Sequence, residues 1–204
     1  MRVPFLSQDG CCRVCGRSVE NVAGGFVCEE CRRWSSAYDA AASAVLFEND
    51  ARDLLHKYKS GESVWLKDDF VDWIEAAARA RYDLIQVDAV VPMPIMLFHR
   101  IDRGYNQCVY LARSLAKRID RICLENAVVR CGHPRRQAGL SEEERRENVI
   151  GTFKVVDASL VRGRTILLVD DVMATGSTLS ECAKTLKEGG AWRVWGLTLA
   201  RSVR

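Results

Sequence analysis

The sequence predicts an α/β protein with a parallel sheet and a small cysteine-rich lobe at its N-terminus. Short, unbroken apolar runs such as Ile166–Val169 indicate strands that are buried on both faces, as in parallel sheets. Segments with helical spacing alternate with these runs, which is typical of right-handed strand–helix–strand connections. Five of the nine cysteines fall between Cys11 and Cys31, so we expect the lobe at residues 1–36 and the α/β domain at residues 37–204.

The composition is typical of a globular protein that does not enter membranes. Its 204 residues are enough for one α/β domain of ordinary size with a small appendage. Hydrophobic residues make up 48% and charged residues 28%, and no apolar run approaches the length of a membrane span. The first ten residues lack the apolar core of a signal peptide. A soluble, cytoplasmic protein is therefore expected, in a compartment where disulfides are rare.

The N-terminal cysteines form two pairs, Cys12-x-x-Cys15 and Cys28-x-x-Cys31, with twelve residues between them. Each pair places two thiolates on a tight turn, and two such turns supply the four sulfurs of a tetrahedral Zn²⁺ site. Cys11 competes with Cys12, but its spacing to Cys15 is looser, so Cys12 is the preferred ligand. Because four protein ligands close the coordination shell, this Zn²⁺ is expected to be structural. A set of buried or redox-active cysteines is the alternative.

The elements of the α/β domain follow from the spacing of apolar residues. Residues 39–49 fit a strand or a helix, and Asp50–Lys59 predicts a helix that ends at basic residues and Gly61. Val64–Arg81 predicts a second helix, with its core face formed by Trp65, Phe70, Trp73, Ile74 and Ala77. The remaining elements are expected as a strand at Ile85–Val91, a helix ending near Ile119, strands at Glu125–Arg130 and Phe153–Asp157, a helix at Leu179–Glu188 and a strand at Trp192–Leu199.

The residues after the run Ile166–Val169 predict a site for a phosphorylated sugar. Asp170 and Asp171 stand where this strand is expected to leave the sheet, and ligands of open parallel sheets bind beyond the carboxyl ends of the strands. Two carboxylates suit sugar hydroxyls or a hydrated Mg²⁺. The turn Ala174-Thr175-Gly176-Ser177-Thr178 then opens a helix, with Ser177 or Thr178 as N-cap, and a helix N-terminus binds phosphate. An ordinary strand-to-helix connection with a good cap is the alternative.

Val91, Pro92, Met93 and Pro94 predict an irregular loop just past another strand. The carboxyl ends of parallel strands share one edge, so we expect this loop beside Asp170. Arg100 and Arg103 follow it and supply cationic donors for phosphate oxygens, unless they belong to a solvated face.

Residues 131–149 form a long, charged connection, which is typical of an active-site lid or of a plain surface loop. Ser141 and Glu144 predict a capping box for a short helix within it. The candidate lid residues are Arg135, Gln137, Arg145 and Asn148. The wider segment 96–146 contains eleven basic and six acidic residues, a net charge of +5 that suits a pyrophosphate, a polyanionic partner or solubility.

The acidic pair with its Thr175-Gly176 turn resembles the ribose-5-phosphate loop of type I phosphoribosyltransferases, although many members carry Thr where this chain has Ala174. That resemblance implies a site for 5-phosphoribosyl-1-pyrophosphate (PRPP) and Mg²⁺. In it, Asp170 and Asp171 hold the ribose 2- and 3-hydroxyls, and residues 174–178 wrap the 5-phosphate.

The joint order of the motifs resembles the ComF family of competence-associated phosphoribosyltransferase-like proteins. The motifs are the four cysteines, Leu55-His56-Lys57-Tyr58-Lys59, Val91-Pro92-Met93-Pro94, Arg103-Gly104-Tyr105-Asn106-Gln107, Gln137-x-x-Leu140 with Arg145-x-x-Asn148, and the acidic-pair loop.

This second resemblance implies that the loop at Pro92–Pro94 and Arg103 lie on the pyrophosphate side, with Arg103 acting beside the acidic pair. It also implies a flexible lid, an acceptor base or amine that the sequence does not name, and a role in DNA uptake. A PRPP-responsive or single-stranded-DNA-binding competence factor without catalysis, or a retained fold without activity, is the alternative.

Overall fold

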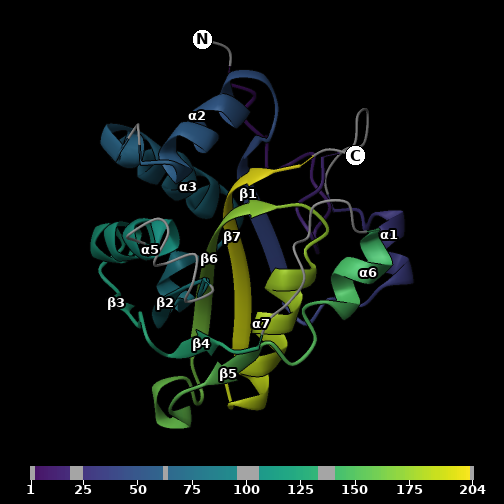
Figure 1. The fold of residues 1–204 in the computed structure, drawn as a ribbon, viewed down its shortest axis with the longest axis vertical. Coiled ribbons are helices and arrows are strands. Elements are labelled where there is room, and N and C mark those ends of the chain that lie inside the picture. Colours follow the sequence, from purple (N-terminus) through teal and green to yellow (C-terminus); the bar gives the residue numbers. More distant parts are fainter. Residues whose placement is uncertain (1–2, 19–24, 62–63, 96–105, 133–140, 203–204) are drawn as a thin grey trace.

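The computed structural model describes residues 3–18, 25–61, 64–95, 106–132 and 141–202. A five-stranded parallel sheet with the strand order β1-β7-β6-β2-β3 forms its centre (Figure 1). Its strands are β1 (Ala40–Leu46), β2 (Ala89–Pro92), β3 (Ile122–Cys123), β6 (Thr165–Met173) and β7 (Arg193–Arg201). A separate antiparallel ribbon pairs β4 (Val128–Arg130) with β5 (Phe153–Val155).

Helices cover both faces of the sheet (Figure 1). One layer contains α2 (Asn49–Lys59), α3 (Lys67–Arg81) and α5 (Gln107–Arg118), and the other contains α7 (Ser177–Glu188) with the shorter α1 (Glu29–Arg33) and α6 (Glu142–Glu147) beside it. Single 3-10 turns lie at Val64–Leu66, Leu84–Gln86 and Ala158–Leu160. Among the described residues, no helix combines the length and the apolar character that a membrane crossing requires.

Alternate residues of β6 build two separate hydrophobic cores. Leu167 and Val169 pack with the layer of α2, α3 and α5, whereas Ile166 and Leu168 pack with α7 and with the N-terminal cysteines. Each of these fully buried side chains contributes roughly 2 kcal/mol through the hydrophobic effect. Because both faces of the strand are covered, its sequence is an unbroken apolar run, and the predicted parallel α/β class is confirmed.

The boundaries of several elements differ from those predicted. Residues 40–46 are a strand, which settles the ambiguity at 39–49. Ile85 is 83% exposed in a 3-10 turn, so the strand begins only at Ala89. Trp65, expected in the core, is 70% exposed because its 3-10 turn ends before α3 starts, and the tryptophan therefore does not share the inner face of that helix.

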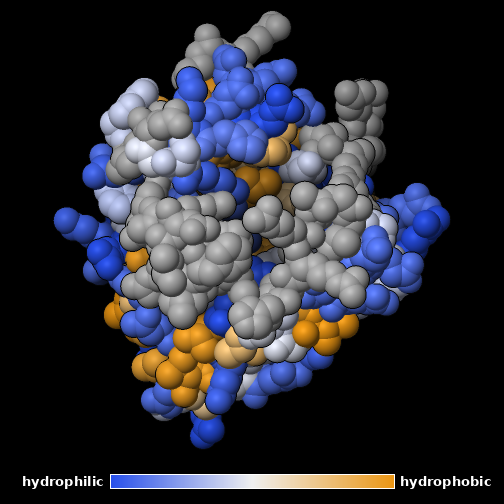
Figure 2. Space-filling model, viewed as in Figure 1, coloured by the Kyte–Doolittle hydropathy of each residue, from blue (hydrophilic) through white to orange (hydrophobic). Residues whose placement is uncertain are grey.

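The strand predicted at Glu125–Arg130 contains only Val128–Arg130, and it pairs with β5 outside the main sheet. The two-residue strand β3 was not predicted, since two residues carry no periodic signal. Exposed apolar side chains, including Ile122, Val129 and Val156, gather around β3, β4 and β5, whereas the surface around α2 and α3 is mainly hydrophilic (Figure 2).

Candidate functional site

The acidic pair lies inside β6 and not beyond its end, because the strand continues to Met173. On one side β6 stays paired with β7 as far as Met173 and Arg201. On the other side the pairing with β2 ends at Pro92 and Val169. Asp170 and Asp171 therefore follow directly after the last β6 residue that pairs with β2. At the carboxyl end of the sheet, the side of β6 that faces β2 is open next to them.

The turn after β6 leads into α7 through Gly176, whose φ is +82°. The N-cap is this glycine and not Ser177 or Thr178, because the turn requires a left-handed backbone that glycine adopts readily. A Cβ at this position would lie 3.0 Å from both Met173 Cε and Tyr38 Oη. The hydroxyls of Thr175 and Ser177 lie 2.7 Å apart, and the Ser177 N–H donates to Thr175 Oγ1 at 3.3 Å.

Asp170 occupies a desolvated position beside a second carboxylate. Its Oδ1 accepts a hydrogen bond from the backbone N–H of Asp171 at 2.8 Å and one from Cys108 Sγ at 3.5 Å. Burial, followed by the charge of Asp171, raises the pKa of Asp170 to about 7. Burial and the same carboxylates raise the pKa of the Cys108 thiol well above its usual value, so this thiol remains a donor.

Asp171 is paired with Lys59, the last residue of α2. Lys59 Nζ lies 2.8 Å from Asp171 Oδ2, and the two side chains are 26% and 16% exposed. Burial by itself lowers the pKa of Lys59, but the attraction of Asp171 and Asp170 outweighs it, so the pKa is raised and the ammonium stays charged. The sequence did not predict Lys59 as a site residue, because its distance to β6 depends on how α2 packs.

The proline-containing loop lies next to the acidic pair, as expected from the shared sheet edge. The Met93 N–H donates to the Val169 carbonyl at 2.7 Å, and the Asn106 side-chain amide donates to the Met93 carbonyl at 3.1 Å. Asn106 also caps α5, since its Oδ1 accepts from the Cys108 N–H at 2.9 Å. Val91 and Pro92 belong to β2, where they pair with Leu168 and Val169 of β6, so the predicted irregular loop begins only at Met93. The role of residues 91–94 in binding pyrophosphate stays a prediction.

Four of the predicted site residues, Arg100, Arg103, Arg135 and Gln137, lie outside the described residues. The capping box of α6 is confirmed: Ser141 N–H donates to Glu144 Oε2 at 2.7 Å, and the Glu144 N–H donates to Ser141 Oγ at 3.2 Å. Arg145 lies in this helix and Asn148 at its C-cap.

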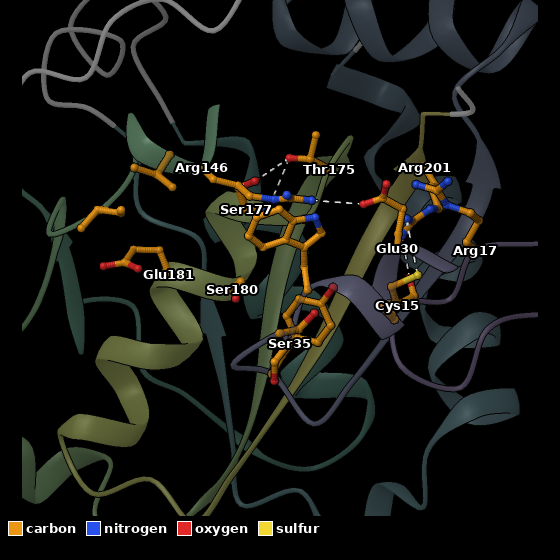
Figure 3. Close-up of a pocket in the computed structure, with 17 residues that line it drawn as sticks. Cys15, Arg17, Glu30, Ser35, Arg146, Thr175, Ser177, Ser180, Glu181 and Arg201 are labelled. Atoms are coloured by element: carbon orange, nitrogen blue, oxygen red, sulfur yellow. Dashed lines mark hydrogen bonds and ion pairs between the residues drawn. The ribbon is translucent and has the colours of Figure 1, made fainter. Parts of the chain in front are cut away.

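A cavity of about 200 Å³ lies between the N-terminal lobe and the start of α7 (Figure 3). Thr175, Gly176 and Ser177 line it from the turn after β6, and Cys15 and Cys31 line it from the lobe. The α6 residue that lines it is Arg146, and neither Arg145 nor Asn148 does so.

The Arg146 guanidinium stacks over the Trp34 ring at 4.2 Å and pairs with Glu30 at 3.1 Å. This contact docks α6 on α1. It was not predicted, because a contact between residues 30–34 and 146 has no signal in the local sequence.

The predicted cysteine ligands converge: the sulfurs of Cys12, Cys15, Cys28 and Cys31 all lie within 4.8 Å of one another. A tetrahedral Zn²⁺ with Zn–S bonds of about 2.3 Å holds its sulfurs about 3.8 Å apart. The sulfurs of Cys15 and Cys28 lie 3.6 Å apart, which is close to this distance. Cys11 does not belong to this cluster, because its thiol donates to the Ser7 carbonyl at 3.1 Å.

The surroundings of the cluster favour a bound cation. Hydrogen bonds from Cys15 and Cys31 lower the pKa of Cys12, whereas hydrogen bonds with Cys12 and Cys15, together with burial, raise the pKa of Cys31, so the thiols compete for protons. A divalent cation would allow all four to ionise. The Cys28 N–H donates to Cys12 Sγ at 3.3 Å, which is the kind of contact that stabilises a metal-bound thiolate.

Arg201 adds a second argument for a metal. It is only 3% exposed, its Nη1 donates to the Cys15 carbonyl at 2.6 Å and its Nη2 lies 3.6 Å from Cys15 Sγ. No carboxylate pairs with it within the described part of the chain. A buried guanidinium is costly without a counter-charge, and four thiolates around one divalent cation carry two net negative charges.

Comparison with known proteins gives consistent results for the family. Residues 105–201 match the family described as phosphoribosyl transferase domain. Competence protein F of Haemophilus influenzae is 30% identical over 195 residues, which cover 93% of this chain and 84% of that protein. The DNA utilization protein YhgH of Escherichia coli (strain K12) is 32% identical over 126 residues, which cover 62% of this chain and 55% of that protein.

Among solved structures, the glutamine phosphoribosylpyrophosphate (PRPP) amidotransferase from B. subtilis aligns with a TM-score of 0.45 at 18% identity, covering 70% of this chain and 30% of that one. This similarity is too weak to support a functional assignment. The similarity to competence protein F extends over most of both chains, and the matched phosphoribosyl transferase domain contains the acidic pair and its turn. This chain belongs to the competence protein F family.

Proposed function

We propose that this protein binds PRPP with Mg²⁺ at residues Asp170–Thr178 and transfers its phosphoribosyl group to an acceptor. The observation that carries this proposal is the acidic pair at an open sheet edge, followed at once by the tight turn into α7. Asp170 and Asp171 accept hydrogen bonds from the ribose 2- and 3-hydroxyls. The first N–H groups of α7, the backbone of Ala174–Gly176 and the nearby hydroxyls bind the 5-phosphate.

In the proposed transfer, the bond between C1 and the diphosphate oxygen breaks and pyrophosphate leaves with the electron pair. The acceptor, a base or an amine, forms a bond to C1 and loses a proton. Mg²⁺ supplies compensating positive charge at the diphosphate. The protein positions the reactants and stabilises the departing charge, for which the sequence offers Arg103 with the segment at residues 91–94, and lid residues such as Arg145.

We also propose that Cys12, Cys15, Cys28 and Cys31 bind one structural Zn²⁺. The support is the mutual distance of their sulfurs and the buried Arg201 beside Cys15. Four protein ligands leave no open coordination position for chemistry.

The relatives are named for competence and for DNA utilization, so we propose that the transferase activity serves DNA uptake. A second candidate is a binding protein without catalysis that contacts single-stranded DNA. The observation that favours it is the net charge of +5 between residues 96 and 146, and its signature is DNA affinity that falls with salt.

The proposed function is tested by calorimetry with PRPP and Mg²⁺ and by pyrophosphate release with candidate bases and amines. The double variant Asp170→Asn/Asp171→Asn is expected to lose PRPP affinity by about a hundredfold, because each carboxylate contributes a charged hydrogen bond. The matched control is Asp68→Asn/Asp69→Asn, an exposed acidic pair at the start of α3, which should leave binding unchanged.

Unchanged PRPP binding and pyrophosphate release in the Asp170/Asp171 variant would show that the site lies elsewhere. If the wild-type protein binds single-stranded DNA and does not bind PRPP, the second candidate replaces the first.

A further inference from the structure

Lys59 reaches the acidic pair from an element outside the sheet. It ends α2, and its Nζ lies 2.8 Å from Asp171 Oδ2. Among the ion pairs of the described residues, this one alone involves Asp170 or Asp171. Lys57 belongs to the same helical turn, yet its side chain is exposed and forms no ion pair among the described residues.

The end of α2 is fixed by contacts with both of its neighbouring helices. Tyr58 is buried and packs edge-on against Phe70 of α3, with ring centroids 5.1 Å apart. The side-chain amide of Gln107, the first residue of α5, donates to the Lys59 carbonyl at 3.3 Å. The Lys59 backbone is thus anchored, whereas its flexible four-carbon side chain can change the direction of the ammonium group.

The layers of the fold indicate which end of PRPP faces Lys59. The 5-phosphate would lie at the start of α7, on one face of the sheet, whereas α2 and α5 pack on the opposite face (Figure 1). With the ribose hydroxyls on the acidic pair, C1 lies at the end of the sugar remote from C5. The diphosphate then extends toward the side of α2, α5 and residues Pro92–Pro94 at the end of β2, which borders β6.

We propose that Lys59 is a substrate-contacting residue: it pairs with Asp171 in the free protein and turns to a diphosphate oxygen when PRPP binds. This inference rests on the proposed function. The exchange leaves no charge without a partner, because the ribose hydroxyls donate to Asp171 as the ammonium leaves it. The diphosphate brings several negative charges beside two carboxylates, and Lys59 supplies a cation at that point.

Calorimetry with two ligands tests the inference: PRPP with Mg²⁺, and ribose 5-phosphate, which lacks the diphosphate. Lys59→Met is expected to weaken PRPP binding roughly ten- to hundredfold, the usual effect of one charged hydrogen bond. Its affinity for ribose 5-phosphate should change less than about threefold. Lys59→Arg should retain most PRPP affinity, because it keeps the charge, and Lys57→Met is the matched control with no expected effect.

The outcomes separate this inference from the proposed function. A wild-type protein that does not bind PRPP overturns both. Wild-type binding with unchanged PRPP affinity in Lys59→Met overturns the inference alone. An equal loss for both ligands would mean that Lys59 only orients Asp171, which also overturns it. Thermal melting checks the fold, and Lys59→Gln, which keeps a hydrogen-bond donor without the charge, repeats the comparison if the methionine variant is unstable.

Discussion

At the scale of one residue, Asp170 belongs to the proposed ligand site and lowers the stability of the fold at neutral pH. Its carboxyl is desolvated and stands beside Asp171, and its pKa is raised to about 7. A group with a raised pKa keeps its proton longer in the folded protein than in the unfolded chain. Unfolding therefore releases a proton between pH about 4 and pH about 7, and the contribution of Asp170 makes the fold less stable as pH rises through this range.

We expect Asp170→Asn to raise the melting temperature at pH 8 by roughly 5 °C, because it removes a poorly solvated charge. At pH 4.5 the wild-type carboxyl is already neutral, so the two proteins should melt at similar temperatures. PRPP affinity of the wild-type protein should fall as pH drops below about 7, where Asp170 becomes protonated. Melting curves and calorimetry between pH 4.5 and pH 8.5 measure both effects. A stability difference that does not depend on pH would contradict this account.

Candidate site residues within one stretch of chain could be proposed from the sequence, whereas candidate residues from different elements could not. The acidic pair and the two cysteine pairs each lie within a few positions, so their spacing alone indicates shared chemistry. Lys59, Cys108 and Arg146 reach the site or the cavity from α2, α5 and α6. Their positions depend on helix packing, which leaves no pattern in the local sequence.

At the scale of elements, the connection from β6 to α7 depends on pairing as well as on residue type. The apolar run stops at Val169, so the sequence placed the strand end there. The strand in fact continues to Met173, because β7 runs beside it as far as Arg201 and supplies backbone partners. The parallel order was predictable from the alternation of buried runs and helices, whereas strand ends depend on the neighbouring strand.

Gly176→Ala is expected to distort this connection. A non-glycine residue in the left-handed region costs roughly 1–2 kcal/mol, and here the new Cβ also meets Met173 and Tyr38 at 3.0 Å. Gly163→Ala is the matched control: its φ is +71°, but a Cβ there meets nothing within 4 Å. Both variants should lose stability in thermal melts, with the larger loss at Gly176. PRPP affinity should fall roughly tenfold or more for Gly176→Ala alone, because the turn proposed to bind the 5-phosphate is displaced. Equal effects of the two variants would exclude a special role for this turn.

At the scale of the whole molecule, the N-terminal lobe and the α/β domain are joined through several contacts. The Ala41 N–H at the start of β1 donates to the Val14 carbonyl at 2.7 Å, and Arg81 of α3 donates to the Cys12 carbonyl at 3.1 Å. The cysteines Cys12, Cys15 and Cys28 share a core with Ile166 and Leu168. The sequence predicted a lobe ending near residue 36, but it gave no sign of this shared core or of the cavity beside α7.

These contacts predict that the proposed Zn²⁺ affects the proposed sugar site. We expect the purified protein to contain about one Zn²⁺ per chain. Removing it with a chelator, or by Cys15→Ser, should lower the melting temperature by roughly 10 °C, because metal binding of this kind contributes several kcal/mol to folding. The matched control is Cys131→Ser, which changes an exposed cysteine outside the cluster and should keep the wild-type zinc content and melting temperature.

Zinc removal should also weaken PRPP binding, because the cavity that the turn at Thr175–Ser177 lines is lined on its other side by the lobe. Arg146 holds α6 against this lobe through Trp34 and Glu30, so a disordered α1 would release α6 as well. On the same zinc-free sample, metal analysis measures the zinc content and limited proteolysis measures the order of the lobe. Calorimetry measures the PRPP affinity. If the lobe becomes sensitive to protease while PRPP affinity stays unchanged, the zinc stabilises only the lobe. A parallel loss of protease resistance and of PRPP affinity would mean that the lobe forms one wall of the sugar site.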